Sequence, residues 1–410
     1  MAVKKIFESV KLFPGEGGVS APKGYICNGI ACGIKPSGKK DLCIIHCRDG
    51  ADAAAVFTNN KVKAAPVKVS RRNLNNKIHT ILCNSGNANA CTGKQGLSDA
   101  RETIKRTAEN FEIPPGSVLL SSTGVIGVPM PMEAIEYGIS KIRRKLNAEN
   151  NVKNAADAIM TTDTRRKIAR VTCLIGGKTI TIGAIAKGSG MIRPDMATML
   201  AFLTTDANIA PKMMQKALKN ATRQSFNKIS VDGQMSTNDT VYILANGLQN
   251  NSLINRPGNN YDIFEYALTL LCKQLAEDII NDGEGITKVI KFSVKKAASK
   301  RDAEIIARTV SDSPLVKTAF YGSSANWGRI IQAVGQCPVK MNPDRVTIIM
   351  NGRTVCENGM GCGISLVEGK QLLNRRNIEV EILLDMGSSS DYILTTDLTY
   401  DYIKINSHYS

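Results

Sequence analysis

The sequence predicts a mixed α/β protein. Short apolar stretches rich in valine, isoleucine and cysteine, bounded by glycine turns, have the length and composition of buried strands. Between them lie longer stretches whose apolar residues recur with the period of an α-helix. At 410 residues the chain is also too long for one small core, so we expect two or three lobes.

The first half of the chain is predicted to begin with strands and to continue with helices. Strands are expected at residues 24–34, 42–47, 53–58 and 80–83. The segment that follows, NSGNANACTG at 84–93, predicts a loop whose turns are supported by side-chain amides. Helices are then expected at 98–111, 131–146 and 152–160, and a hairpin of strands 169–175 and 178–186 around Gly176-Gly177.

The second half alternates helices and strands. A helix is expected at 211–227, where Pro211 suits a first helical turn, and another at 261–281. Residues 230–246 predict a polar loop that leads into a strand. The remaining expected elements are a strand, a helix and a strand at 289–294, 302–310 and 315–320, a turn at Trp327-Gly328, and strands at 346–350 and 378–384.

The composition is that of a globular protein without a membrane span. Hydrophobic residues make up 43% of the chain, and no window approaches the run of about eighteen apolar residues that a spanning helix needs. The N-terminal segment contains no apolar run typical of a secretory signal. The eleven cysteines, an odd number without a Cys-x-x-Cys motif, indicate reduced, buried thiols in a cytoplasmic protein rather than disulfides or a zinc site.

The net charge of +17 raises the question of a nucleic-acid partner. The positive residues are scattered, with short clusters such as 61–72 and 143–145, and aromatic residues make up only 5% of the chain. Platforms for stacking on single strands are therefore few. We expect no nucleic-acid partner, and a solvated surface or a small anionic substrate instead.

Several familiar kinds of active site lack the residues that they need. The three histidines are too few for a Ser-His-Asp triad or a histidine-rich metal site, and His46 lies in an apolar strand, where a hydrogen-bonded core imidazole is usual. Gly177-Lys178-Thr179 resembles the end of a phosphate-binding loop, but Thr172 stands where the earlier glycine is required. The polar segment 232–239 lacks the alternating ligands of a calcium loop. Among the kinds of active site considered, these exclusions leave one whose nucleophile carries its own base.

The segment KGSGMIRPDMATML at 187–200 offers such a nucleophile. A threonine hydroxyl is a weak nucleophile unless a base lies beside it, and cleavage of the preceding peptide bond frees an α-amine that titrates near neutral pH. This hypothesis makes Ala197–Thr198 the site of self-cleavage and Thr198 the catalytic residue. Taken alone, the same residues also fit a plain glycine turn followed by the apolar face of a buried segment.

An acyl-transfer site also needs hydrogen-bond donors for the developing oxyanion. The segment SSTGVIGVP at 121–129 offers the hydroxyl of Thr123 and, at Gly124, a backbone N–H that no side chain shields. A strand-to-helix turn with a capping hydroxyl is the alternative interpretation.

Together these segments resemble the ornithine acetyltransferase family, also called bifunctional glutamate N-acetyltransferase. The resemblance covers nearly the whole chain, and its motifs stand in one order: NSGNANACTG (84–93), STGVIG (122–127), MTTDT (160–164), KGSGMIRPDMATMLAFLTTDA (187–207), STNDT (236–240), DGEGITK (282–288), NWGRI (326–330) and DLTYDYIKIN (397–406). Each motif alone is modest evidence, whereas the ordered set is highly specific.

The resemblance implies a two-lobed, self-processing fold with an N-terminal-threonine nucleophile. The precursor is expected to cleave itself at Ala197–Thr198 into an α chain (1–197) and a β chain (198–410). The two chains are expected to stay together and to pair into an α2β2 assembly.

The resemblance also implies a reaction and its site. Thr198 attacks the acetyl carbonyl of N-acetylornithine, Thr123 and Gly124 stabilise the oxyanion, and glutamate then takes the acetyl group in cyclic arginine biosynthesis. The substrate-binding residues carried over by motif are Thr161, Lys187, Thr198, Glu284 and Asn406. Lys187 suits a substrate carboxylate and Glu284 a substrate ammonium. The scheme implies no metal and no organic cofactor, and it leaves open whether acetyl-CoA also serves as a donor.

The sequence departs from the usual family pattern in three places. The family usually has Asp-Gly-Asp before the STNDT motif, where this chain has Asp232-Gly233-Gln234. An acidic residue is usual in the segment before Asn326, which here is Ser323-Ser324-Ala325. The family's terminal hydroxyl contact with substrate would fall to Ser410, the last residue of the sequence.

Two other functions stay open. A self-processing N-terminal-threonine amidohydrolase or aminopeptidase would use the same nucleophile and pass its acyl group to water. A basic binding protein for RNA or anionic surfaces would fit the net charge of +17 and would remain an uncut chain of 44.3 kDa.

Overall fold

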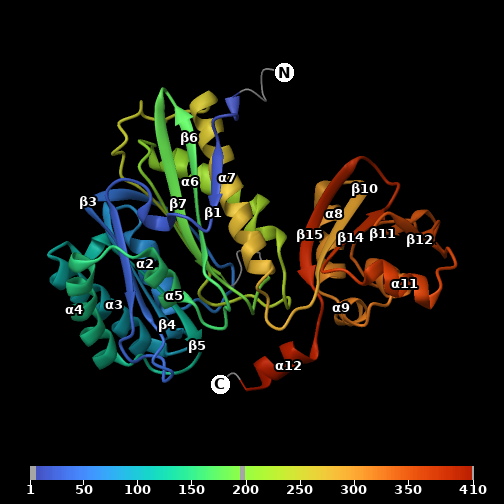
Figure 1. Ribbon diagram of the computed structural model, residues 1–410, viewed down its shortest axis with the longest axis horizontal. Helices are drawn as coiled ribbons and strands as arrows, with labels where there is room; N and C mark the ends of the chain where they lie inside the picture. The colour runs from blue at the N-terminus through green and yellow to red at the C-terminus, as the bar shows by residue number, and fades with distance from the viewer. Residues whose placement is uncertain (1–5, 194–198, 409–410) are drawn as a thin grey trace. The chain divides into compact units, whose positions relative to one another are not determined.

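The structure is a computed structural model that describes residues 6–193 and 199–408 (Figure 1). It confirms the mixed α/β class and divides into two compact units. Unit 1 comprises Met1–Gly188, Pro194–Asn227 and Met235–Ile279, and unit 2 comprises Ser189–Arg193, Lys228–Gln234 and Ile280–Ser410. This division concerns packing rather than cleavage, so the division at Ala197–Thr198 stays a prediction. Ala197, Thr198 and Ser410 lie outside the described residues.

Among the described residues, unit 1 contains a nine-stranded sheet in the order β1-β6-β7-β8-β9-β3-β4-β5, with β2 paired to β3 beside this path. Its strands are β1 (Lys11–Pro14), β2 (Tyr25–Ile30), β3 (Leu42–Phe57), β4 (Ile78–Asn87), β5 (Val118–Val125), β6 (Lys167–Ile175), β7 (Lys178–Lys187), β8 (Leu200–Thr205) and β9 (Thr240–Ala245). The pairs β4–β5 and β8–β9 are parallel, and the other pairs are antiparallel.

The long strand β3 folds this sheet back on itself. Its first part pairs with β4 and its last part with β9, and the register shifts between His46 and Ala51. Such an irregularity bends a strand. Side chains of β4 and β5 consequently share one core with Phe202 of β8 and Tyr242 of β9. The Tyr242 hydroxyl, fully buried, donates to the Leu120 carbonyl oxygen at 3.0 Å and so satisfies its polar atom.

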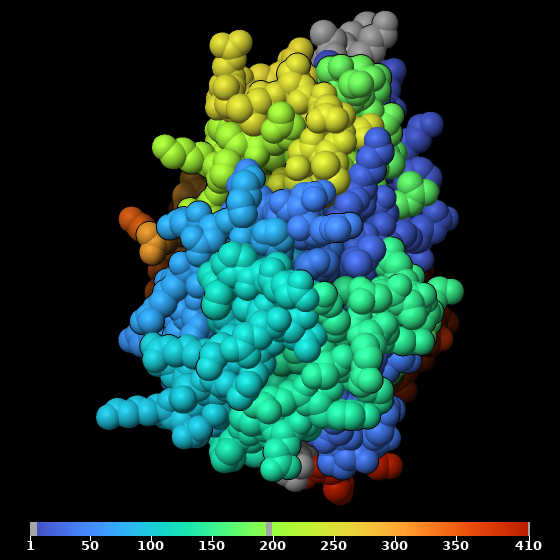
Figure 2. Space-filling view, turned by 90° about the vertical axis from the view of Figure 1, so that its left-hand side faces the viewer, coloured from blue at the N-terminus to red at the C-terminus, as the bar shows by residue number. Residues whose placement is uncertain are grey.

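Helices pack on this sheet. They are α2 (Ala65–Asn73), α3 (Gly93–Phe111), α4 (Met132–Ala148), α5 (Val152–Ile159), α6 (Pro211–Gln224) and α7 (Asn259–Ile280). Helix α5 contributes Ala155 and Ile159 to the core that Phe202 and Tyr242 share. Along β4 the side chains alternate, so that Ile81 belongs to the folded core whereas Leu82 packs with residues of α3 and α4. Figure 2 shows the side of the molecule on which α3 and α4, in cyan to green, form the surface.

Unit 2 contains a second sheet with its own core. Its described residues form six strands in the order β13-β12-β11-β14-β10-β15. These are β10 (Val289–Ala297), β11 (Thr347–Met350), β12 (Arg353–Glu357), β13 (Met360–Gly361), β14 (Asn377–Leu383) and β15 (Ser389–Thr396). The helices are α8 (Lys300–Ser311), α9 (Pro314–Tyr321), α10 (Trp327–Gly335), α11 (Leu366–Leu373) and α12 (Tyr400–Ser407).

The predicted elements agree with the structure in most of the chain. The hairpin around Gly176-Gly177 is confirmed, since β6 pairs with β7 through Ile175 and Lys178, and both glycines have positive φ. The predicted strand at 315–320 is wrong, because Pro314 and the Ser313 side chain, which accepts from the Val316 N–H, begin helix α9 there.

Other differences concern where elements begin and end. The expected turn at Trp327-Gly328 is the first turn of α10, which Asn326 caps by accepting from the Arg329 N–H. Strand β4 continues to Asn87, so the expected loop begins later than predicted. Its side-chain amides do support it, since the Asn89 amide donates to the Gly96 carbonyl oxygen at 3.0 Å.

Two expectations from composition can be compared with the described residues. Among them, no helix combines the length and apolar character that crossing a bilayer requires. All eleven cysteines are free, and all except Cys91 and Cys362 are buried, as expected for buried thiols. His46 is also the hydrogen-bonded core imidazole that was predicted, because its Nδ1 lies 2.9 Å from the Thr80 hydroxyl and burial lowers its pKa to about 4.

Candidate active site

Thr123 and Gly124 lie at the end of β5, where parallel pairing with β4 sets Ser85 opposite Thr123 and Gly86 opposite Gly124. Gly124 has a φ of +135°, and a Cβ there would lie 2.3 Å from the Gly86 carbonyl carbon. Only glycine therefore fits this close approach of the two strands. The predicted oxyanion residues thus lie at the paired end of a strand.

The asparagine-rich segment after β4 fixes the chain that follows Gly124. The Asn87 amide donates to the carbonyl oxygens of Val128 and Pro129 at 3.1 and 3.0 Å. The Ala88 N–H donates to the Val125 carbonyl oxygen at 2.9 Å. These bonds give the segment a structural role beside the predicted oxyanion residues.

Lys187 joins three of the predicted site residues. It ends β7 and is only 4% exposed, and its ammonium donates to the Thr161 hydroxyl at 2.8 Å and to the Thr123 hydroxyl at 3.3 Å. Thr161 follows α5, and Thr123 ends β5. The structure therefore brings Thr123, Thr161 and Lys187 together in unit 1, as the sequence predicted.

A buried carboxylate compensates the charge of this cluster. Asp163 and Lys167 have fully buried side chains, 2.6 Å apart, and Lys187 Nζ lies 3.9 Å from the other Asp163 oxygen. Burial favours the neutral acid, but Lys187 and Lys167 outweigh it and lower the pKa of Asp163 to about 2. Asp163 is thus a carboxylate at neutral pH. The MTTDT motif contains Asp163, but no local pattern in the sequence indicated that this side chain is buried.

Asp239, in the STNDT motif, is a second buried acid that the sequence did not assign. Its Oδ1 accepts from the Met199 N–H at 2.9 Å, and burial raises its pKa well above the ordinary value. Met199 directly follows Thr198 in the sequence. Asp239 therefore anchors the first described residue after the predicted cleavage bond. An acidic residue immediately before an apolar strand is the signal that could have found it.

In unit 2, Glu284 and Asn406 contact each other. Glu284 is 7% exposed, and its carboxylate accepts from the Asn406 amide at 2.8 Å. The Glu284 N–H donates to the Ser189 carbonyl oxygen at 3.1 Å. A Cβ on Gly190 would lie 2.3 Å from the Glu284 carboxylate, so this second glycine of the KGSG sequence leaves room for the acid.

Asp232 and Tyr402 support this pair. The Asp232 carboxylate accepts from the N–H groups of Met191 and Ile192 at 2.6 and 3.0 Å and from the Tyr402 hydroxyl at 3.1 Å. Burial is the main cause that raises the pKa of Asp232, and the nearby Glu284 adds to it. These contacts fix segment 189–193 of unit 2 beside Glu284.

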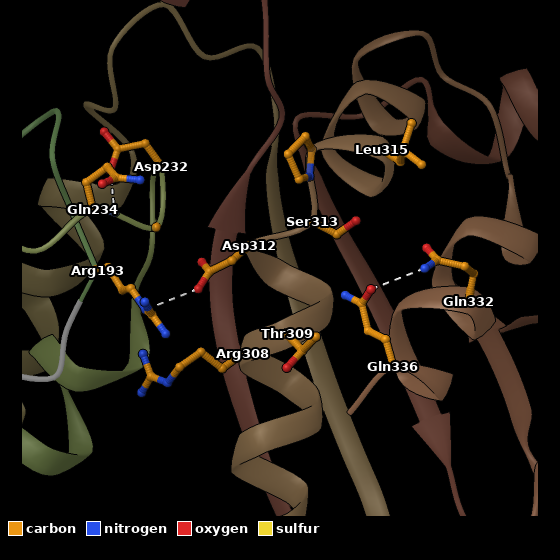
Figure 3. Close-up of a pocket in the computed structure, with 12 residues that line it drawn as sticks. Arg193, Asp232, Gln234, Arg308, Thr309, Asp312, Ser313, Leu315, Gln332 and Gln336 are labelled. Carbon is orange, nitrogen blue, oxygen red and sulfur yellow. Dashed lines mark hydrogen bonds and ion pairs between the residues drawn. The ribbon is translucent and has the colours of Figure 1, made fainter. Parts of the chain in front are cut away.

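A pocket of about 550 Å³ in unit 2 contains one of the departures from the family pattern (Figure 3). Gln234, where an aspartate is usual, lines it and donates its backbone N–H to Asp232 at 3.1 Å. Across the same pocket Arg193 lies 3.3 Å from the Asp312 carboxylate. Basic and acidic residues that line this pocket balance one another, so it holds no excess charge for an ionic ligand.

The predicted site residues thus form a group in each unit, Thr123, Thr161 and Lys187 in unit 1 and Glu284 and Asn406 in unit 2. The predictions for Ala197, Thr198 and Ser410 fall outside the described residues. In the described part of the chain, no three His, Cys, Asp or Glu side chains are grouped so that they could hold a metal ion.

Comparison of the sequence with known proteins identifies one family. The model of the ArgJ family matches residues 26–410. The arginine biosynthesis bifunctional protein ArgJ of Bacillus licheniformis is 43% identical over 396 residues, which cover 96% of this chain and 97% of the relative. The protein of the same name from Caldanaerobacter subterraneus is 44% identical over 402 residues, 96% of this chain and 98% of the relative.

Solved structures include the ornithine acetyltransferase of Mycobacterium tuberculosis in complex with ornithine. It is 33% identical to this chain and covers 46% of it and 99% of its own length, with a TM-score of 0.42.

Proposed function

The chain belongs to the ArgJ family, and on this premise we propose that it transfers the acetyl group of N-acetylornithine to glutamate in arginine biosynthesis. The names of its relatives support a role in that pathway, and its own motifs support the acetyl transfer. The observation that carries most weight is the bonding of Lys187 to both Thr161 and Thr123. It puts a cation for an amino-acid carboxylate beside a proposed oxyanion donor.

The proposed reaction begins with a self-cleavage that frees the α-amine of Thr198. The Thr198 hydroxyl attacks the acetyl carbonyl of N-acetylornithine, and its own amine takes the hydroxyl proton. The Thr123 hydroxyl and the Gly124 N–H stabilise the oxyanion. The amide C–N bond then breaks, the ornithine amine leaves with the proton, and the acetyl group remains as an ester on Thr198.

The second half of the reaction reverses these steps with another amine. The α-amine of glutamate attacks the ester carbonyl, the C–O bond to Thr198 breaks, and N-acetylglutamate leaves. The threonine hydroxyl is regenerated, so no oxidant, reductant or organic cofactor enters the balance.

Substrate recognition is proposed to use the two groups of residues described above. Lys187 binds the α-carboxylate that ornithine and glutamate share, with the Thr161 hydroxyl beside it. Glu284, held by Asn406, binds a substrate ammonium. Asp163 lies 3.9 Å from the Lys187 ammonium and holds it in place, which makes Asp163 a positioning residue.

The finer properties of the protein are proposed from the family resemblance. We assign an α chain of 1–197 and a β chain of 198–410, paired as an α2β2 assembly in the cytoplasm. Ser410 is assigned a contact with substrate. These assignments add no cofactor and no nucleic-acid partner.

Assays with N-acetylornithine and glutamate test this function. The proposal expects N-acetylglutamate and ornithine in equal amounts when both substrates are present, and no acetate when glutamate is omitted. Steady release of free acetate without glutamate would assign the amidohydrolase activity instead. A Lys187→Met variant is expected to raise the KM of both amino-acid substrates, whereas Lys212→Met, on the exposed face of α6, leaves them unchanged.

A further inference from the structure

Unit 1 contains a pocket of about 680 Å³ beside the Lys187 cluster. Its walls are the loop 35–40, between β2 and β3, and the segment 160–164 that carries Thr161. This volume is typical of a small-molecule site. Because Thr161 lines the pocket and also accepts a hydrogen bond from Lys187, the pocket adjoins the proposed site for the substrate α-carboxylate.

The loop is held in a defined conformation by one buried acid. The fully buried Asp41 carboxylate accepts from the N–H groups of Cys32, Ile34 and Lys35 at 2.7, 2.8 and 3.0 Å. This irregular stretch of chain is thereby tied to the start of β3. Hydrogen bonds to a carboxylate are strong, so the Lys35 side chain extends from a fixed backbone.

The Lys35 ammonium contacts the segment that carries Thr161. It donates to the Lys40 and Met160 carbonyl oxygens at 2.8 and 2.7 Å. An ammonium has a further N–H donor beyond these two. Within residues 6–193 and 199–408, Lys35 forms no ion pair with a carboxylate. Since Lys35 lines the pocket, this donor and the positive charge are available to a bound anion.

The surroundings of Lys35 favour a ligand carboxylate. Burial is the main cause that lowers the pKa of Lys35 to about 8, with Asp41 opposing this shift and Lys187 adding to it. Lys35 is thus mostly an ammonium at neutral pH, but water solvates its charge only in part. An anion bound beside it would replace the lost solvation and stabilise the charged form.

The two acids that line this pocket already have cationic partners. Asp163 belongs to the buried cluster described above, in which two lysines compensate its charge. Asp157 accepts from Arg166 at 3.0 Å and lies 3.5 Å from Lys40. Neither acid forms an ion pair with Lys35. The carboxylate that Lys35 can bind is therefore that of a ligand.

We propose that the Lys35 ammonium binds the side-chain carboxylate of glutamate, the acetyl acceptor, while Lys187 binds the α-carboxylate of the same molecule. Lys35 contacts Met160 and Lys187 contacts the next residue, Thr161, so the two ammonium groups meet neighbouring residues of one segment. This inference rests on the proposed function.

The charges of the two amino acids explain why such a group selects glutamate. Glutamate carries a carboxylate at each end, and two ammonium groups match it. Ornithine and N-acetylornithine carry one carboxylate, and their side chains end in an ammonium that Lys35 repels and Glu284 is proposed to bind. Lys35 is thus a specificity-determining residue that acts on the acceptor and not on the donor.

The test compares the two half-reactions in Lys35→Met, which removes the charge and keeps the length of the side chain. In a ping-pong reaction, kcat/KM for each substrate reports only the half-reaction of that substrate. The value for glutamate is expected to fall about tenfold or more, because a hydrogen bond between charged groups is lost. The value for N-acetylornithine is expected to stay within about twofold.

Glutamine as the acceptor separates recognition of the carboxylate from general damage to the loop. It has the shape of glutamate without the side-chain charge, so the wild-type protein should use it about tenfold less efficiently or worse. In Lys35→Met the preference for glutamate over glutamine should largely disappear. Lys35→Gln, which retains donors for the two carbonyl oxygens, should lose the same preference.

The matched control is Lys39→Met, an exposed lysine of the same loop with the same change of net charge. It should keep the preference for glutamate, since an exposed charge is screened by water and salt. A loss of preference as large as in Lys35→Met would overturn the assignment to Lys35.

Two further results would overturn the proposal and leave the proposed function standing. The first is an unchanged kcat/KM for glutamate in Lys35→Met. The second is an equal fall for glutamate and glutamine, which would give Lys35 a structural role only. If the wild-type protein transfers no acetyl group from N-acetylornithine to glutamate, the proposed function itself fails.

Discussion

Replacing Asp163 with asparagine is expected to destabilise the protein by about 3–5 kcal/mol, because a fully buried lysine then loses its carboxylate. The structure supplies the reason for this size. Asp163 and Lys167 are 2.6 Å apart with no exposed side-chain surface, and the Gly188 N–H also donates to the carboxylate at 2.7 Å. An amide of the same shape keeps the volume but removes the charge that both Lys167 and Lys187 require.

The pKa of Asp163 gives a second measure of the same interaction. Its value of about 2, against an ordinary 3.8, corresponds to about 2–3 kcal/mol of stability at neutral pH. Because the folded-state pKa is the lower one, this stability is present above the ordinary pKa and is lost as the pH falls from about 4 to about 2. The free energy of unfolding should therefore fall less steeply with decreasing pH in Asp163→Asn than in the wild-type protein over this range.

Urea unfolding at neutral pH of Asp163→Asn, Lys167→Met and the double variant measures this coupling. The double variant should be less destabilised than the sum of the single changes, because it leaves neither buried charge alone. Asp157→Asn is the matched control, because that carboxylate is 25% exposed with a partly exposed Arg166 partner and should cost about 1 kcal/mol or less. A free energy of unfolding for Asp163→Asn within about 1 kcal/mol of the wild-type value would refute this reasoning.

Two glycine substitutions give further predictions. Gly124→Ala is expected to lower kcat for acetyl transfer by about tenfold or more, since its Cβ would lie 2.3 Å from the β4 backbone and displace a proposed oxyanion donor. The control in steady-state assays is Gly127→Ala, because Gly127 also has a positive φ but has open space around its Cβ. Gly190→Ala should raise the KM for N-acetylornithine with little change in stability, because its Cβ would lie 2.3 Å from the Glu284 carboxylate. The control is Gly335→Ala, where a Cβ meets no other atom within 4 Å. Equal KM values in the two variants would count against the role of Glu284.

Local patterns predicted most of the fold of unit 1. The helical period found α3, α4 and α5, and the glycine pair found the β6–β7 hairpin, because these elements depend on residues close in sequence. The ordered motifs also predicted the family, which the match over 26–410 confirms. Thr123, Thr161 and Lys187 were named from their motifs, and the structure brings them together.

The sequence-based predictions are wrong or incomplete where the structure depends on contacts between distant residues, or where two local signals disagree. The apolar run at 315–320 fits a strand and a helix equally well by period, and the start signals of Ser313 and Pro314 decide for α9. The roles of Asp41 and Asp163 depend on burial, which tertiary packing determines. A carboxylate in a polar motif looks like a surface residue until the strands that cover it are known.

The most direct test of the account is the intact mass of the denatured protein after incubation with N-acetylornithine in the absence of glutamate. The account predicts two fragments that meet at Ala197–Thr198, with the C-terminal one heavier by one acetyl group that glutamate then removes. The Thr198→Ala variant should remain one inactive chain of 44.3 kDa less the mass of one oxygen atom and a methylene group. A single uncut, unacetylated wild-type chain with full transferase activity would contradict it.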